Sequence, residues 1–517
     1  MPSLSYRVKH KLFAFIESVP PLAKLANRWA INRVVNRARP RPHPLSTAQD
    51  YVCWQGLTDR RWSGRHLPAR PRIKNPDPNE LLALFKRREG KQRLCPKSTC
   101  LFPAFAQYLT DGFIRTESEN LMVKGADPAT RLRRNTSNHE IDLCTLYGRN
   151  TEQTDALRLK SDAQKGRLKS QMIGAEEYPP FLNKGGKVKP EFKVLDQPLG
   201  DSDIDAARKA KLFACGGDRV NSVPQTAMMN TLLLREHNRL AGEIAAAHPH
   251  WDDNRVFETA RNTMIVLFIK LVVEDYINHI SPLPFNLRAD PSVAWEAPWN
   301  KPNWITTEFS LLYRWHALIP DQVKWGSLRP VGETFMNNAL LTEGGLLQAF
   351  TDMSATQTGE LGPMNTAEPL LKVELASIMQ DRDCELASFS DYCYYMGQSR
   401  PETFADISSD PEVAGLLAKL YEQPADVDFH VGLFCEDRVE NSPLPNLVLL
   451  FVALDAFSQA LTNPLLSRQV FSQTTFSVPG WQAIHETQTV RDVVDRNVPG
   501  GAGDAFIGMT LASWQPE

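Results

Sequence analysis

The chain has 517 residues, of which 42% are hydrophobic and 23% are charged, proportions that are ordinary for a soluble globular protein. A chain of this length buries a core that needs neither disulfides nor a structural metal, and its net charge of −2 argues against a dedicated nucleic-acid binder. The eight cysteines include no CxxC pair, which excludes the usual zinc-ribbon and thioredoxin-like motifs.

Neither a secretory leader nor a membrane span is evident in the sequence. The first residues lack a compact apolar run followed by a small-residue cleavage site. The longest apolar stretches, residues 264–269 and 447–454, are too short to cross a bilayer. Together with the sparse cysteines, these features predict an intracellular protein that meets a membrane only at its surface.

The first 42 residues differ in charge from the rest of the chain. They hold about nine Lys or Arg residues and a single acid, Glu17. Apolar residues recur at helical spacing, and the Pro20-Pro21 pair divides the segment into two short helices. Basic amphipathic helices that carry aromatic residues are typical of interfacial membrane binding, and surface helices with solvated basic faces are the alternative.

A proline-rich run, RPRPHP at residues 39–44, breaks the helical pattern and marks a boundary. We therefore expect membrane-surface helices over residues 1–42 and one catalytic domain over residues 43–517. Within that domain, residues 160–212 are polar and rich in Lys, Gly and Pro, which predicts long surface loops. Helical periodicity predominates in five other segments, which are residues 222–281, 308–318, 331–350, 365–397 and 445–463. These patterns predict a mainly α-helical fold.

The segment 311–321, LLYRWHALIPD, contains the most informative pair of residues. Tyr313 and His316 are three residues apart, so on a helix they project from nearly the same face. A neutral imidazole is the usual proximal ligand of haem iron in a peroxidase-like site. A tyrosine beside such a haem can lose an electron and a proton, and the resulting radical can abstract hydrogen from carbon. The spacing alone also fits two ordinary core residues.

Several segments, in the same order, resemble one family of enzymes. The segment LYRWHALIPD (312–321) is similar to the proximal-helix signature of the cyclooxygenases, or prostaglandin endoperoxide synthases, which belong to the animal-type haem peroxidase superfamily. TLLLREHNR (231–239) resembles a motif of the whole superfamily. The other matching segments are AQDYVCW (48–54), FAQYLT (105–110), IDLCTLYG (141–148) and EDYINHIS (274–281). The resemblance runs from about residue 30 to residue 480, and it implies a large helical peroxidase-like catalytic domain.

The resemblance implies roles for the residues around the haem. It makes His316 the proximal ligand of a haem b iron and Tyr313 the residue that forms the radical. Tyr276 corresponds to the tyrosine that hydrogen-bonds the radical tyrosine. His430 stands where the family has a tyrosine near the proximal histidine, so we expect it to orient that ligand.

The resemblance also places two residues in the oxygenase channel. Phe457 and Ser458 match the Phe-Ser pair that lines the channel in the family. The alternative for Ser458 is a helix serine whose hydroxyl is satisfied by its own backbone.

The distal side departs from the family pattern. Gln107 matches the distal glutamine, but Asp111 stands where the family has the distal histidine. The two are four residues apart, so both can face the haem. A histidine titrates near about 6.5 and an aspartate near about 3.9, so an exposed aspartate rarely carries the proton that hydroperoxide cleavage needs. We therefore expect weakened peroxidase activity, partly restored if burial raises the pKa of Asp111. Arg219 resembles the distal-side arginine of the wider peroxidase group.

The expected channel mouth departs as well. Val35 falls at the position of the arginine that anchors the fatty-acid carboxylate, with Arg33 and Arg37 on either side, and Leu283 falls at the position of the helping tyrosine. Either arginine could form the bidentate ion pair after a small register shift. Basic residues that face lipid headgroups are the alternative.

Two other histidines compete as iron ligands. His237 lies in the TLLLREHNR motif, to which the resemblance assigns a structural role. His279 is interpreted as a histidine near the end of a helix. We therefore expect neither to bind iron.

The resemblance predicts a haem-dependent dioxygenase that uses O₂ as co-substrate. Its expected substrate is a polyunsaturated fatty acid, and it is expected to be a peripheral membrane protein and a homodimer. The sequence lacks the epidermal-growth-factor-like module and the leader of the animal enzymes, which suggests a bacterial or otherwise intracellular relative. The alternatives are an α-dioxygenase-like enzyme, a haem peroxidase of small reductants, and a haem- or lipid-binding protein without activity.

Overall fold

A computed structural model of the protein describes most of the chain. The described residues are 4–38, 62–70, 76–88, 90–112, 114–115, 134–200, 204–302 and 304–516. The expected boundary at residues 39–44 and the AQDYVCW segment at 48–54 lie outside them. The cysteines that the structure describes are all free thiols.

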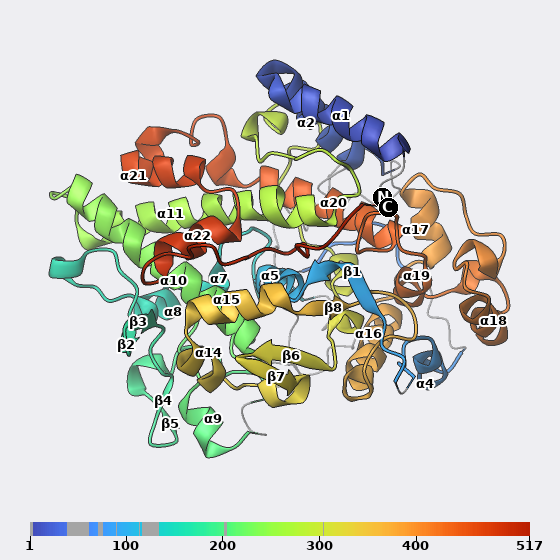
Figure 1. Ribbon diagram of the computed structural model, residues 1–517, viewed down its shortest axis with the longest axis horizontal. Coiled ribbons are helices and arrows are strands. Elements are labelled where there is room, and N and C mark those ends of the chain that lie inside the picture. Colours follow the sequence, from blue (N-terminus) through green and yellow to red (C-terminus); the bar gives the residue numbers. More distant parts are fainter. Residues whose placement is uncertain are drawn as a thin grey trace.

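The fold is mainly α-helical, as the periodicity predicts (Figure 1). The helices are α1 (Leu4–Ser18), α2 (Pro20–Val35), α4 (Pro78–Leu81), α5 (Leu101–Thr110), α7 (Cys144–Tyr147), α8 (Thr151–Leu157), α9 (Ala206–Ala210), α10 (Pro224–Ala247), α11 (Asp253–Leu271), α12 (Asn278–Ile280), α13 (Thr307–Leu312), α14 (Ala339–Gly344), α15 (Leu346–Ala355), α16 (Leu371–Asp383), α17 (Phe389–Tyr395), α18 (Pro411–Leu420), α19 (Phe429–Cys435), α20 (Asn446–Leu461), α21 (Gln473–Glu486) and α22 (Val490–Asn497).

The strands form four small antiparallel pairs among the described residues. The pairs are β1 (Leu94–Thr99) with β8 (Gln357–Gly359), β2 (Gln171–Ile173) with β3 (Glu176–Tyr178), β4 (Asn183–Lys184) with β5 (Lys187–Val188), and β6 (Gln322–Trp325) with β7 (Ser327–Pro330). Two of these pairs, β2–β3 and β4–β5, lie in the region 160–212 that was expected to be surface loops. The hairpins there are short, and most of their residues are at least partly exposed.

Two long helices form the centre of the molecule. α10 begins at Pro224, whose missing N–H costs nothing in the first helical turn, and α11 begins after Asp252, whose carboxylate caps the backbone N–H of Arg255. The two helices pack against each other, α5 packs on α10, and α21 packs on both (Figure 1). The apolar side chains that they share are buried, so α5 is held firmly against the core.

An aromatic stack joins α5 to the end of α11. The Phe105 ring lies 5.3 Å from the Phe268 ring and 5.6 Å from the Tyr276 ring, between centroids, and Phe102 stacks on Tyr276 at 5.7 Å. Beyond α11 the chain continues in a π-helical turn, Val272–Ile277, which carries Tyr276. This stack fixes the position of the Tyr276 ring.

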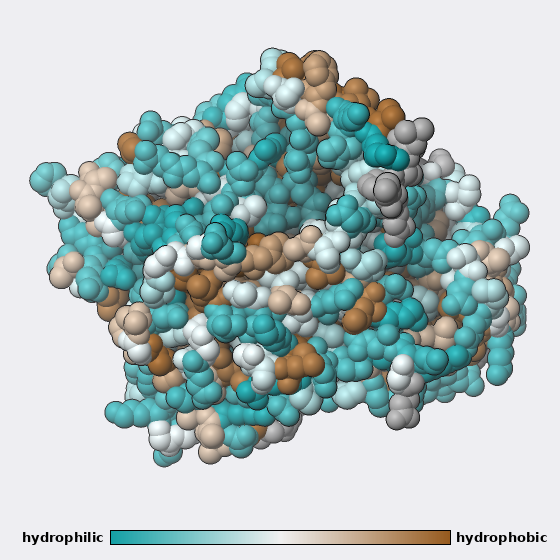
Figure 2. Space-filling view, in the orientation of Figure 1, coloured by the Kyte–Doolittle hydropathy of each residue, from teal (hydrophilic) through white to brown (hydrophobic). Residues whose placement is uncertain are grey.

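The N-terminal segment forms two helices divided at the proline pair, as predicted. Ile31 and Val35 are buried, and α2 packs against α20. Six other apolar side chains of the segment are exposed, and Figure 2 shows apolar side chains gathered over these helices at the top of the molecule. They are Val8, Leu12, Phe15, Leu22, Leu25 and Trp29. None of the described helices has the length and apolar character that crossing a bilayer would require.

The helix expected over residues 308–318 is interrupted, which corrects the prediction. α13 ends at Leu312, Tyr313 is its C-cap, and Trp315 has a non-helical backbone with φ −90° and ψ 46°. A short 3₁₀ turn, η8 (His316–Leu318), then precedes Ile319 and Pro320. Because the residue before a proline is driven out of the helical region, the sequence after His316 cannot extend the helix for long.

Candidate active site

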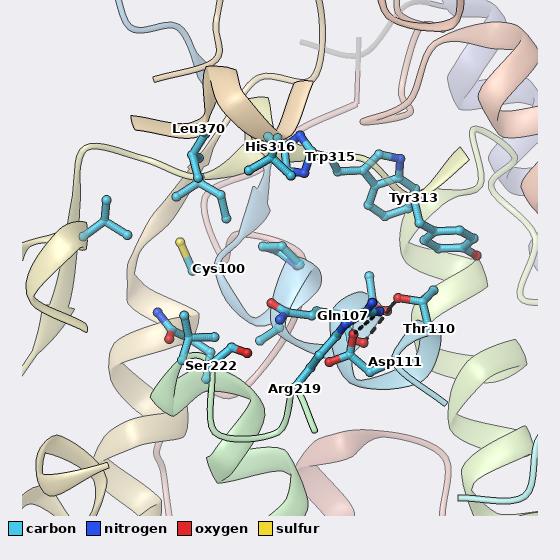
Figure 3. A pocket seen from close by; sticks show the side chains of 18 of the residues that line it. Cys100, Gln107, Thr110, Asp111, Arg219, Ser222, Tyr313, Trp315, His316 and Leu370 are labelled. Atoms are coloured by element: carbon cyan, nitrogen blue, oxygen red, sulfur yellow. Dashed lines mark hydrogen bonds and ion pairs between the residues drawn. The ribbon is translucent and has the colours of Figure 1, made fainter. Parts of the chain in front are cut away.

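One cavity, of about 430 Å³, contains the residues that the sequence singled out around the haem. Its lining comes mainly from α5, from the loop that precedes α10, and from the segment 313–320, and residues between 323 and 373 complete it. Figure 3 shows Trp315 and His316 on one wall, with Gln107, Asp111 and Arg219 on the opposite wall. Tyr313 also lines the cavity. The structure therefore brings together the predicted proximal and distal residues.

The proximal wall holds His316 against a buried carboxylate. The His316 Nδ1 atom lies 3.1 Å from Glu374 Oε1, although the ring is not turned so that its N–H points straight at that oxygen. Glu374 is only 2% exposed. Because Nδ1 is engaged on the protein side, Nε2 is the ring nitrogen available to an iron in the cavity.

Glu374 also has partners at both of its oxygens. The Thr366 hydroxyl donates to Oε1 at 2.9 Å, and His430 Nε2 lies 3.4 Å from Oε2. Burial disfavours the charged carboxylate, but the adjacent imidazoles of His316 and His430 outweigh it and lower the pKa of Glu374 to about 2. His430 therefore reaches His316 through Glu374, an intermediary that the sequence did not reveal.

Tyr313 is held at the edge of the same cavity. The Tyr276 hydroxyl donates a hydrogen bond to the Tyr313 phenol oxygen at 3.3 Å. The Tyr313 ring also contacts the rings of Phe309 and Trp315, each at 4.8 Å between centroids. Burial raises the pKa of Tyr313 far above neutrality, so the residue is a neutral phenol with a proton to lose.

Asp111 on the distal wall has the environment of a proton-transfer group. Its Oδ1 atom lies 3.9 Å from Arg219 Nη1, and its buried Oδ2 atom has no hydrogen-bond partner among the described residues. Burial raises the pKa of Asp111 from its ordinary 3.8 to about 7, against the opposing charge of Arg219. Both forms of the carboxyl are therefore present at neutral pH.

Arg314 lines the cavity, and the sequence assigned no role to it. It lies between Tyr313 and Trp315, and its Nη2 atom donates to Gln380 Oε1 at 3.1 Å. Burial, with repulsion from Arg219, lowers the pKa of Arg314 to about 10. The guanidinium still remains charged near neutrality, so it contributes positive charge to the cavity wall.

The cavity suits a haem. Much of its lining is apolar, a single imidazole faces it from one side, and an unpartnered carboxylate oxygen faces it from the other. Within the described part of the chain, no three His, Cys, Asp or Glu side chains gather as a metal site. An iron held by His316 alone would need its other ligands from a macrocycle, which a porphyrin provides.

The predicted channel residues lie elsewhere. Phe457 and Ser458 are buried on α20 and do not line this cavity, and the Ser458 hydroxyl donates to the Asp455 carbonyl oxygen at 3.1 Å. That backbone bond is the alternative foreseen for a helix serine. The channel assignment of these two residues stays a prediction.

The residues expected at the channel mouth are not gathered in one place. Arg37 Nε donates to the Met396 carbonyl oxygen at 3.0 Å, and the Arg33 guanidinium lies over the ring of Trp29, 5.2 Å from its centroid. Leu283 is 49% exposed and lines a different groove, beside Tyr6, His10 and Trp514. The two arginines and Leu283 therefore do not form one common binding site for a carboxylate in this structure.

The two competing histidines are fully engaged within the core. His237 Nδ1 lies 2.8 Å from the Tyr147 hydroxyl, and its Nε2 atom lies 2.8 Å from the Gly166 carbonyl oxygen. His279 lies 2.9 Å from the Ser98 hydroxyl and 2.7 Å from that of Thr510. Both ring nitrogens of each histidine are therefore in contact with protein groups, and the expectation that neither binds iron stays a prediction.

Comparison with known proteins identifies the family of the chain. The animal haem peroxidase family matches residues 103–503 of the chain. Prostaglandin G/H synthase 1 from Mus musculus is 30% identical over 454 residues, which cover 84% of this chain and 71% of that protein.

Two solved structures are similar to the whole fold, each with a TM-score of 0.69. Peroxidase A from Dictyostelium discoideum is 19% identical, and the match covers 85% of this chain and 92% of that one. The fatty acid alpha-dioxygenase from Oryza sativa is 16% identical, and the match covers 96% of this chain and 94% of that one. The family match over more than half of the sequence confirms the resemblance read from its motifs. The chain belongs to the animal haem peroxidase family and is a haem-dependent oxidoreductase.

Proposed function

We propose that the protein is a haem-dependent fatty-acid dioxygenase of the cyclooxygenase type. Tyr313 carries the proposal, because a neutral buried phenol hydrogen-bonded by Tyr276 lies on the same short segment as His316. A peroxidase of small reductants needs no such tyrosine. The proposed substrate is a polyunsaturated fatty acid and the co-substrate is O₂.

His316 and the distal residues would hold a haem b in the cavity. When bound, the haem supplies the oxidising equivalents that remove one electron from Tyr313. The phenol loses its proton at the same time, and the Tyr276 hydrogen bond holds the phenoxyl oxygen in place. The phenoxyl oxygen then takes a hydrogen atom from an activated carbon of the acyl chain. O₂ adds to the carbon radical, and the peroxyl radical takes a hydrogen atom back from the Tyr313 phenol, which gives a hydroperoxide and restores the phenoxyl radical.

Asp111 is proposed as the distal acid–base group. As a carboxylate it accepts the proton of a hydroperoxide, and as the acid it returns that proton to the leaving oxygen. The raised pKa of Asp111, about 7, provides both forms near neutral pH. A carboxyl still lacks the reach and the two nitrogens of an imidazole, so we expect peroxidase activity that is reduced and not lost. Gln107 and Arg219 face the same space and would orient the hydroperoxide.

The helices α1 and α2 are proposed to lie on a membrane surface, because their exposed apolar side chains stand beside basic ones. Under this proposal residues 1–42 are the membrane-facing part and residues 43–517 the catalytic domain. Peripheral membrane attachment rests on these helices, an intracellular location on the sparse cysteines, and a homodimer on the family resemblance. Arg33 and Arg37 are then headgroup contacts or carboxylate anchors.

A second candidate function is α-dioxygenation, in which hydrogen is abstracted beside the carboxylate. The likeness to the Oryza sativa fatty acid alpha-dioxygenase favours it, because that match covers 96% of this chain. Both candidates would use Tyr313 and His316. They differ in the carbon that receives oxygen.

The test is oxygen uptake by the haem-reconstituted protein on arachidonate and linoleate, with a trace of hydroperoxide as initiator. We expect uptake by the wild type, none by Tyr313→Phe, and normal uptake by Tyr178→Phe, a buried tyrosine outside the cavity lining. Guaiacol oxidation should survive in Tyr313→Phe. Loss of both activities would contradict the role of Tyr313, and product mass spectra showing oxygen at C-2 would favour the α-dioxygenase.

A further inference from the structure

The proximal wall contains a carboxylate whose position the family resemblance does not explain. Glu374 comes from α16, far from His316 in sequence, and it is the acid that contacts the imidazole on the side away from the cavity. We propose that Glu374 is the positioning residue of His316 and that it makes this ligand electron-rich. The inference rests on the proposed function, because it requires His316 to bind the haem iron.

The Glu374 carboxylate is held by contacts at both of its oxygens. Glu374 Oε1 is shared between His316 Nδ1 at 3.1 Å and the Thr366 hydroxyl at 2.9 Å. Its Oε2 lies 3.4 Å from His430 Nε2. The His430 ring is itself fixed, since it stacks on Phe85 at 5.5 Å between centroids and its backbone N–H donates to Asp381 at 2.8 Å. Partners at both oxygens leave the carboxylate little freedom to turn away.

The Nδ1 contact can become a linear hydrogen bond when the imidazole turns. The distance is already short, and the angle is the unfavourable part. Rotation of the imidazole about its Cβ–Cγ bond changes that angle while the carboxylate stays fixed. A ligand bond at Nε2 would hold the ring in one such orientation, so Glu374 and the iron would select the same one.

A carboxylate partner has chemical consequences that a neutral partner lacks. It keeps the hydrogen on Nδ1, which leaves the Nε2 lone pair for the metal. It also draws that hydrogen toward itself, so the imidazole becomes a stronger electron donor. A stronger donor stabilises the oxidised iron more than the reduced iron, and the reduction potential falls. Thr366 and His430 donate to the same carboxylate and therefore moderate its effect.

Two nearly isosteric variants predict shifts of opposite sign. Glu374→Gln removes the negative charge, so the ferric/ferrous midpoint potential of the holoprotein should rise and haem should dissociate about 10- to 100-fold faster. Thr366→Val removes only a competing donor, so the carboxylate should pull harder on His316 and the potential should fall. The measurements are spectroelectrochemical titration and haem transfer to apomyoglobin. Loosened packing alone would move both variants in the same direction.

The controls separate this inference from the function on which it rests. Glu436→Gln makes the same exchange at a partly buried carboxyl after α19, outside the cavity, and it should leave the potential unchanged. His316→Ala should abolish the wild-type haem spectrum. An unchanged spectrum in His316→Ala would overturn the proposed ligand, whereas a changed one with unaltered potentials in Glu374→Gln and Thr366→Val would overturn only the role of Glu374. If Glu374→Gln does not fold, Thr366→Val decides, and an unchanged or raised potential overturns the inference.

Discussion

The Tyr276 hydroxyl donates to the phenol oxygen of Tyr313 across 3.3 Å, and a π-helical turn places it there. A π turn accommodates one residue more than an α-helical turn, and such turns are frequent at functional sites. Without the extra residue, Tyr276 would project from a different side of the helix. The pairing therefore depends on a local departure from the α11 geometry.

Tyr276→Phe should slow fatty-acid oxygenation several-fold without abolishing it. The variant loses one hydrogen bond, worth about 1 kcal/mol, that holds the phenoxyl oxygen in place. The kcat for oxygen uptake should fall, and the electron paramagnetic resonance spectrum of the Tyr313 radical should show an altered g-tensor. Guaiacol oxidation is the internal control and should not change. An unaltered radical spectrum would show that the two hydroxyls do not interact during turnover.

Asp111→His should raise the rate of hydroperoxide reduction. General acid–base catalysis contributes about 10²- to 10⁴-fold, and an imidazole both accepts and returns the proton more readily than a carboxyl. We expect a gain of at least about tenfold in kcat for a lipid hydroperoxide at pH 7. Gln107→Glu, on the same helix, tests whether any new titratable group would have the same effect. No gain in Asp111→His would contradict the distal role of this position.

Asp111 should also make the stability of the apoprotein depend on pH. Folding raises the pKa of this carboxyl from 3.8 to about 7, so ionisation is disfavoured in the folded state and stability falls as the pH rises between these values. The expected loss is roughly 4 kcal/mol, complete above pH 7. Asp111→Asn cannot ionise, so its advantage in urea unfolding should grow from pH 4 to pH 7 and then stay constant. A constant difference over that range would mean that folding does not perturb the carboxyl.

Gly359→Ala should weaken haem binding through the backbone. Gly359 ends β8, and a Cβ at this position would overlap the Ala317 carbonyl oxygen, next to His316. The overlap must move the 3₁₀ turn, at a cost of about 1–3 kcal/mol. Haem dissociation should then be about tenfold faster or more. Gly415→Ala, where an added Cβ meets nothing within 4 Å, is the matched control.

The exposed apolar side chains of α1 and α2 should determine vesicle binding. Leu12 is 56% exposed and Leu25 is 65% exposed. Burial of each side chain in a bilayer interface would contribute about 1.5–3 kcal/mol to the free energy of binding. The double variant Leu12→Glu/Leu25→Glu should lose more than tenfold in partitioning to anionic liposomes, measured by co-sedimentation. Leu328→Glu changes a leucine on β7 that is 64% exposed, and it should bind normally. Equal binding by all three proteins would assign α1 and α2 to ordinary surface helices.

The sequence predicted the distal helix better than the proximal segment. Gln107 and Asp111 are four residues apart on or next to α5, and the periodic apolar residues around them place both in the cavity. Tyr313 and His316 also reach the cavity, but not on one helix, because the chain leaves helical geometry after Leu312. The spacing correctly predicted that the two side chains share a site, although the backbone between them is not helical. Periodicity does not record such a local change of backbone, in which Trp315 has φ −90° and ψ 46°.

Glu374 could not be found from the sequence. It is one of three acids on α16, and its partners His316, Thr366 and His430 come from three other segments. A pattern within one helix shows which face is buried, and it does not show which distant side chain meets that face. The burial that raises the pKa of Asp111 also could not be read from the pattern of its own helix. In both cases the chemistry depends on long-range contacts.

The groove shared by Tyr6, His10 and Trp514 brings the two ends of the described chain together beside α1. Thr510 lines it too, and the Lys97 ammonium lies 4.7 Å from the centre of the Trp514 ring, which ties the C-terminal segment down. A purification tag at either end would thus stand beside α1, on the side that carries Tyr6 and His10. The same placement is useful for detection. An environment-sensitive dye attached near residue 516 would report contact between α1 and a bilayer without any change to the helix itself.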